Sequence, residues 1–88
     1  MDFGNITNFR ELFMVLGSNP EGDYKNAYNE AAELAKKLTE DKTDNWDEEE
    51  FGEVITEKYK VEPEFMKALI ACIRNRNPIV DIPDDPLW

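Results

Sequence analysis

The sequence of 88 residues contains no histidine and a single cysteine. Histidine is the commonest metal ligand and general base in proteins, so its absence removes Ser-His and Cys-His catalytic arrangements. The lone cysteine, Cys72, can form neither an intramolecular disulfide nor a cysteine zinc site. We therefore expect a protein that is not an enzyme and that has no cofactor and no metal centre.

Basic residues are also scarce. Ten lysines and arginines stand against twenty aspartates and glutamates, which gives a net charge of −10. Nucleic acids and anionic membranes attract proteins through Lys and Arg, so this charge favours basic proteins or cations as partners instead. The longest uncharged run is too short to span a bilayer, and residues 1–16 lack the basic start of a signal peptide. We expect a cytoplasmic protein.

The sequence does contain enough apolar residues for one small core, since 41% of its residues are hydrophobic and 11% are aromatic. Apolar residues recur in four segments at the 3.6-residue spacing that is typical of helices. We predict an all-α, four-helix bundle with helices near residues 6–16, 21–38, 47–59 and 63–76.

Prolines 78, 83 and 86 exclude a further helix after this bundle. We therefore assign residues 1–77 to one helical domain and residues 78–88 to an extended, proline-rich tail. The tail contains several apolar residues, among them Trp88, so two alternatives remain open. It packs across its own domain, or it docks into a partner.

The first helix has clear signals at both ends. Thr7 or Asn8 is a candidate N-cap, and Gly17 is placed as a helix stop. Met14 and Val15 widen the apolar stripe of this helix, which predicts that it is buried on more than one side.

The later helices carry signals of close packing. Alanines in the second helix predict a close approach by a neighbouring helix, and Gly52 inside the third helix predicts a tight crossing. Asp44 or Asp47 is the candidate N-cap of the third helix.

Residues 40–57 hold most of the charge. They include nine acidic residues and one lysine, a net charge of −8, so the rest of the chain carries only −2. Evenly spread acidity would be explained by solubility alone, whereas uneven acidity favours a binding surface. We expect this surface to bind a basic protein through Asp44, Trp46, Asp47, Glu48, Glu49, Glu50, Glu53, Glu57 and Trp88. The plainer interpretation of both tryptophans is that they close the core.

A ridge of carboxylates is similar in physical type to small inhibitors of nucleic-acid-binding enzymes, to immunity proteins that neutralise toxins and to several anti-CRISPR proteins. No motif in the sequence identifies one of these families. The likeness implies a protein-interaction module, such as an inhibitor or nucleic-acid mimic, and a nucleic-acid-binding protein as one form of partner.

Residues 55–67, ITEKYKVEPEFMK, resemble the helix-turn-helix segment of small regulators. The quoted segment is 13 of the 88 residues, and the resemblance implies an alternative function, a nucleic-acid-binding regulator that uses residues 51–76. Lys60 stands where the turn of that motif usually has glycine. Glu62 and Glu64 place carboxylates where the recognition helix would approach phosphates, so electrostatics oppose this function.

The loop of residues 39–50 resembles a degraded calcium-binding EF-hand loop, with Glu50 in its final, bidentate place. Thr39 stands where the motif has its first aspartate, and Asp44 stands where glycine permits the sharp turn. The alternative to calcium binding is an acidic loop that caps the following helix.

Overall fold

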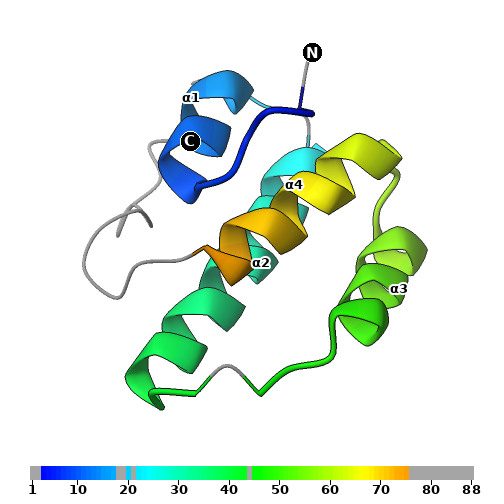
Figure 1. Cartoon of the computed structure of the whole chain (residues 1–88). Coiled ribbons are helices and arrows are strands. Elements are labelled where there is room, and N and C mark those ends of the chain that lie inside the picture. Colours follow the sequence, from blue (N-terminus) through cyan, green and yellow to red (C-terminus); the bar gives the residue numbers. More distant parts are fainter. Residues whose placement is uncertain (1–2, 18–19, 21, 44, 76–88) are drawn as a thin grey trace.

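The computed structural model describes residues 3–17, 20, 22–43 and 45–75, and these residues form four α-helices and no strand (Figure 1). The prediction of an all-α protein with four helices is therefore confirmed. The helices are α1 (Phe9–Leu16), α2 (Gly22–Glu40), α3 (Glu48–Lys58) and α4 (Pro63–Arg74). The predicted tail of residues 78–88 lies outside the described residues.

The ends of α1 follow from two residues that the sequence marks. Of the two candidate caps, Asn8 serves, because its side chain accepts a hydrogen bond of 2.8 Å from the backbone N–H of Glu11. The helix therefore begins at Phe9 and not near residue 6. Gly17 ends it with a φ of +79°, a backbone conformation that favours glycine, and this prediction is confirmed.

Met14 and Val15 correct one expectation. Both are exposed, Met14 to 73%, so α1 is buried on one side and not on several. The buried residues of α1 are Phe9, Leu12 and Leu16. Successive residues turn by 100°, which places Met14 and Val15 on the flanks that face away from this stripe.

Although α4 is the last of the four helices in sequence, it lies at the centre of the fold and contacts α1, α2 and α3 (Figure 1). Its buried residues include Phe65, Leu69 and Cys72, each without exposed area. α2 runs along α4 and buries a row of alanines, Ala27, Ala31, Ala32 and Ala35. Alanine side chains leave room for the close approach of helices that the sequence predicts.

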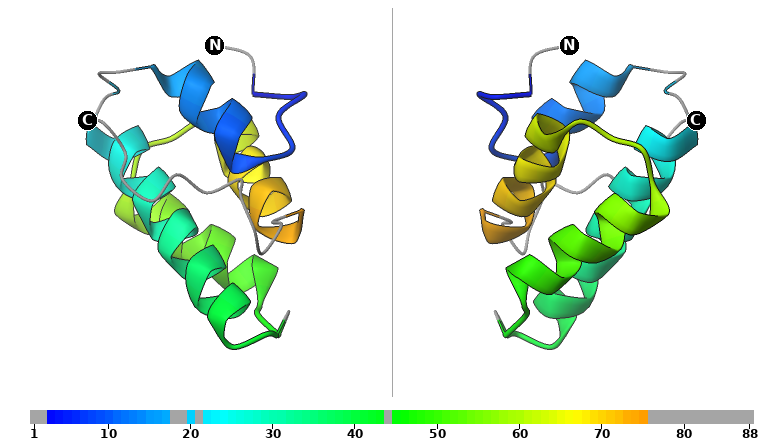
Figure 2. Two further views of the ribbon diagram at one scale, coloured as in Figure 1. Left: turned by 90° about the vertical axis from the view of Figure 1, so that its left-hand side faces the viewer. Right: turned by 90° about the vertical axis from the view of Figure 1, so that its right-hand side faces the viewer.

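The segment before α1 contributes to the core, although it has no regular structure. Figure 2 shows this lead, drawn in dark blue, beside α1 and the start of α4. Phe3 is only 2% exposed, and its ring lies edge-on to Phe65 with 5.0 Å between the ring centroids. The same Phe65 ring meets Tyr24 of α2 at 4.7 Å. Phe3 thus links the N-terminal lead to two helices through an aromatic cluster.

Replacing Phe3 by alanine should lower the free energy of unfolding by about 3 kcal/mol, because a buried ring is lost and a cavity remains. Urea denaturation followed by circular dichroism measures this change. Met14→Ala is the control, and its exposed position predicts a change of no more than about 0.5 kcal/mol. Equal effects of the two substitutions would show that Phe3 does not belong to the core.

Candidate functional site

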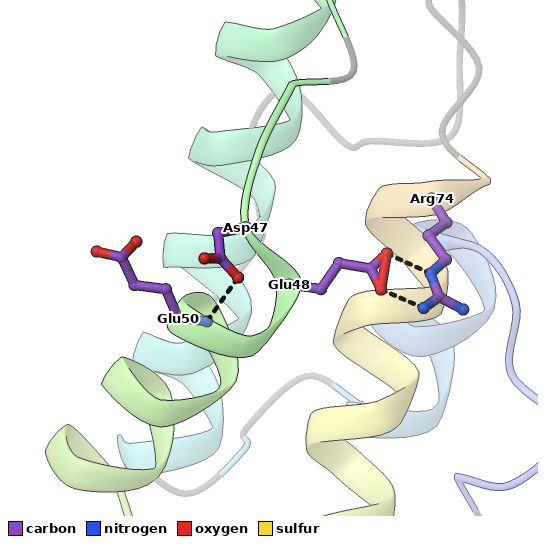
Figure 3. A network of polar contacts seen from close by, with 4 residues as sticks. All are labelled: Asp47, Glu48, Glu50 and Arg74. Carbon is purple, nitrogen blue, oxygen red and sulfur yellow. Dashed lines mark hydrogen bonds and ion pairs between the residues drawn. The ribbon is translucent and has the colours of Figure 1, made fainter.

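α3 begins directly after its N-cap, Asp47. One carboxylate oxygen of Asp47 accepts a hydrogen bond of 3.1 Å from the backbone N–H of Glu50 (Figure 3). The other candidate cap, Asp44, lies outside the described residues. Glutamates 48, 49 and 50 occupy the first turn, where the positive end of the helix dipole favours negative charge. Asp47 thus has a structural task in addition to any role in binding.

The remaining acidic side chains of α3 lie away from the core. Ile55 is fully buried and Gly52 is buried beside it, which fixes the inner side of the helix. Residues four apart lie on the same side of a helix. Glu49, Glu53 and Glu57 therefore form one line on the outer side, and Glu50 lies next to it. We call these four exposed residues, Glu49, Glu50, Glu53 and Glu57, the acidic row.

Between residues that the structure describes, no ion pair involves the acidic row. Lys58, the nearest lysine in sequence, pairs instead with Glu30 of α2, with 3.1 Å between Nζ and Oε1. Burial raises the pKa of Glu30, but hydrogen bonding by Tyr59 and Lys58 outweighs burial and holds this pKa below its usual value. Lys58 thus pairs with Glu30 of α2 and not with a glutamate of the acidic row.

Glu48 has a partner within the chain. The Arg74 guanidinium donates two hydrogen bonds to its carboxylate, Nε to Oε2 at 2.5 Å and Nη2 to Oε1 (Figure 3). The pair joins the first turn of α3 to the last turn of α4, and each charge complements the dipole of its own helix. Hydrogen bonding by Arg74 lowers the pKa of Glu48. We therefore leave Glu48 out of the acidic row.

The two tryptophans expected at the site differ in what the structure describes. Trp46 is half-buried and packs against the core. Its ring meets Phe51 edge-on, with 5.9 Å between ring centroids and 82° between ring planes. This placement agrees with the plainer interpretation of Trp46. Trp88 lies outside the described residues.

An open groove of about 930 Å³ runs between α3 and α4. Its apolar floor is formed by Gly52, Met66, Ile70 and Ala71. A Cβ atom at Gly52 would lie 3.3 Å from the Met66 sulfur, so the glycine permits the close crossing of α3 and α4 that the sequence predicts. The Thr56 hydroxyl donates to the Gly52 carbonyl oxygen at 2.7 Å and lies 3.1 Å from the same sulfur.

Charged side chains form the walls of this groove. Glu49, Glu53 and Glu57 of the acidic row line it on the α3 side, and Lys67 lines it on the α4 side. The Glu48–Arg74 pair crosses from one helix to the other. The groove thus combines an apolar floor with walls of opposite charge.

The groove cannot be found from helical periodicity, because Met66 and Ile70 recur at the same spacing as the buried residues of α4. Both are only partly buried. A signal was nevertheless present, since α4 carries apolar residues on most of its circumference. A helix of this kind has more apolar surface than one face of a small bundle covers.

Residues 55–67, which resemble a helix-turn-helix, span the end of α3, the connection of residues 59–62 and the start of α4. This connection is fastened to α2, because the backbone N–H of Lys60 donates to the Asp23 carboxylate at 3.1 Å. The described basic residues of α4 are Lys67 and Arg74, and Arg74 is engaged by Glu48. The acidic row lies across the groove from them.

Comparisons with protein-family models, with curated proteins and with solved structures find no match for the chain. Within the described ranges, no cluster of three Cys, Asp or Glu side chains is arranged to hold a metal ion. In the same ranges no helix has both the length and the apolar character that crossing a membrane requires.

Replacing Arg74 by glutamine should return the pKa of Glu48 towards its ordinary value of about 4.3. A pKa that is lower in the folded than in the unfolded state stabilises the fold above the unfolded-state value, and this stabilisation is lost as pH falls through the folded-state value. The thermal midpoint of the parent protein should therefore fall more steeply than that of Arg74→Gln below about pH 5.

Melting curves between about pH 6 and pH 2, with NMR titration of the Glu48 carboxyl, measure both effects. Lys67→Gln is the control, since it removes one cation from the same helix without touching Glu48. An identical pH dependence in the parent and Arg74→Gln proteins would contradict a role for the ion pair.

Proposed function

We propose that the protein is a non-enzymatic interaction module that binds a basic surface of another protein through the acidic row of α3. The observation that carries this proposal is the exposure of Glu49, Glu50, Glu53 and Glu57 on one side of a helix. No cation in the described part of the chain pairs with them. Their charge is thus available to attract a basic partner and to accelerate its association.

The arrangement of these charges favours binding over solubility as its explanation. Like charges four residues apart on a helix repel and each pair costs about 0.2–0.5 kcal/mol. Glu49 faces Glu53 in this way, and Glu53 faces Glu57. A protein that needs only solubility can spread its charge, whereas residues 40–57 hold −8 of the net −10. A row of repelling charges is explained if a partner neutralises it.

The spacing of the row favours a mimic of nucleic acid as the form of this module. Glu57 lies eight positions after Glu49, and the helical rise of about 1.5 Å per residue makes this about 12 Å. Four carboxylates over that length average about one charge per 4 Å of helix axis, close to the one phosphate per ~3.4 Å of axis along one DNA strand. A basic groove that normally receives a phosphate backbone is therefore a suitable partner surface.

Direct binding of nucleic acid by residues 51–76 has less support. Such binding needs free cations near the recognition helix. In α4, Arg74 is engaged by Glu48, and the acidic row stands next to Lys67 across the groove. Phosphates approaching this side would meet more negative than positive charge.

Neutralising three residues of the row, with Glu49→Gln, Glu53→Gln and Glu57→Gln together, should weaken partner binding at least about tenfold, because electrostatic attraction is lost. The control changes the net charge equally on α1 and α2 with Glu11→Gln, Glu33→Gln and Glu40→Gln, all exposed. Immobilised protein is tested on extract from its native cells at about 50 mM and about 500 mM salt, where screening differs strongly.

The parent protein and the control should retain the same basic protein at low salt and release it at high salt. The row variant should not retain it. The proposal is wrong if the parent protein captures no basic protein, or if the row variant captures the partner as well as the control does. Binding of duplex DNA by the isolated chain at low salt would favour the regulator instead.

A further inference from the structure

The groove between α3 and α4 lies directly beside the acidic row. Glu49, Glu53 and Glu57 belong to both features, because they form one wall of the groove. A partner that contacts these carboxylates therefore also meets the apolar floor of Met66, Ile70 and Ala71. Charge and apolar surface are thus presented together to the same molecule.

We propose that this groove receives an amphipathic α-helix of the partner, and this inference rests on the proposed function. The apolar side of the partner helix lies on Met66, Ile70 and Ala71. A line of lysines or arginines along one edge of that helix faces the acidic row. The opposite edge, towards Lys67, is acidic or neutral.

The spacing of the wall matches a helix. Consecutive carboxylates in the line Glu49, Glu53 and Glu57 are four residues apart, a rise of about 6 Å. Basic residues at positions i, i+4 and i+8 of a partner helix have the same rise and lie on the same side. Each cation can then meet one carboxylate along the length of the groove.

An extended peptide fits this groove less well. Peptide strands bind by adding their backbone hydrogen bonds to an open sheet edge, and the described chain contains no strand. Backbone N–H and C=O groups laid on Met66 and Ile70 would lose water and gain no partner. A helix satisfies these groups internally, so only its side chains need to match the groove.

The floor is suited to an incoming apolar side. Met66 is flexible and polarisable, and side chains of this kind adapt to the shape of bound helices. Among the described residues, the one hydrogen bond to the Met66 sulfur comes from the Thr56 hydroxyl. Ile70 and Ala71 of α4 remain partly exposed next to it.

The charge of the wall selects a basic partner over two other occupants. A second copy of this chain carries a net charge of −10, so its approach to the acidic row is repelled. The C-terminal residues 76–88 are apolar but include Asp81, Asp84 and Asp85 with a single arginine. A basic amphipathic helix has both the apolar side and the charge that the groove requires.

The test uses the full chain and two synthetic peptides of about 18 residues, five turns of helix. The first peptide places leucines on one side of a helix and lysines along one edge of that side. The second has the same composition in an order without helical periodicity. Fluorescence anisotropy gives the dissociation constant of each peptide for the parent protein, for Ile70→Gln, for Met14→Gln and for the triple variant Glu49→Gln, Glu53→Gln and Glu57→Gln, called the neutralised variant below.

The ordered peptide should bind the parent protein at least about tenfold more tightly than the scrambled peptide. Ile70→Gln should weaken the ordered peptide about fivefold or more, because its apolar contact with the floor is lost. Met14→Gln, an equally apolar-to-polar change at an exposed position of α1, should leave binding unchanged. Ala71→Gln replaces Ile70→Gln if the thermal midpoint shows that Ile70→Gln is unfolded.

Equal binding of the two peptides, with no effect of the floor substitution, would overturn this inference. The proposed function would survive that result if neutralising the acidic row still weakened both peptides. It would fail together with the inference if the neutralised variant bound both peptides as tightly as the parent does. Displacement of the ordered peptide by a peptide of residues 76–88, or by self-association of the chain, would assign the groove to another occupant.

Discussion

Packing of α4 against α1, α2 and α3 is the interaction on which the described structure depends. Phe65, Leu69, Cys72 and Ile73 have no exposed area, because three helices and the N-terminal lead surround them. α4 nevertheless carries more apolar surface than these neighbours cover. The uncovered part, at Met66 and Ile70, forms the floor of the groove. The candidate site thus follows from the way the central helix is packed.

The carboxylates at the start of α3 and along it have two different roles. Some stabilise the helix, and the others are exposed to solvent. Asp47 caps its first turn, and Glu48 ties that turn to Arg74 at the end of α4. Gly52 and Ile55 are the buried residues of α3, and they pack the middle of this helix against the rest of the fold. With both tasks filled, the acidic row is free to face outward on a fixed scaffold. Charges carried by a helix lose less conformational entropy on binding than the same charges on a flexible loop, which favours the proposed interaction.

Much of the fold could be predicted because each helix has local signals, including Asn8, Gly17 and Asp47, that need no tertiary information. The sequence does not decide between Thr7 and Asn8 as the cap of α1. Only the backbone geometry shows which side chain accepts the hydrogen bond. Met14 was placed wrongly, since an apolar residue on a short helix is buried only where a neighbour covers it. Phe3 was missed because its short lead has no periodicity.

The candidate site was predictable only in part. Charge density and helical spacing place Glu49, Glu53 and Glu57 on one side of a helix, and this can be worked out from sequence. The internal partner of Glu48 could not, because Arg74 is far away in the chain. The groove depends on how α3 crosses α4 at Gly52, and helical periodicity does not contain that geometry.

The most direct test of the central claim is methyl NMR of the full chain during titration with a basic amphipathic helix. A partner helix seated in the groove should shift the methyl signals of Met66 and Ile70 together with the backbone amides of residues 49–57, while the methyl signal of exposed Met14 stays unchanged. Shifts restricted to the acidic amides, or spread equally to Met14, would contradict binding of a helix in this groove.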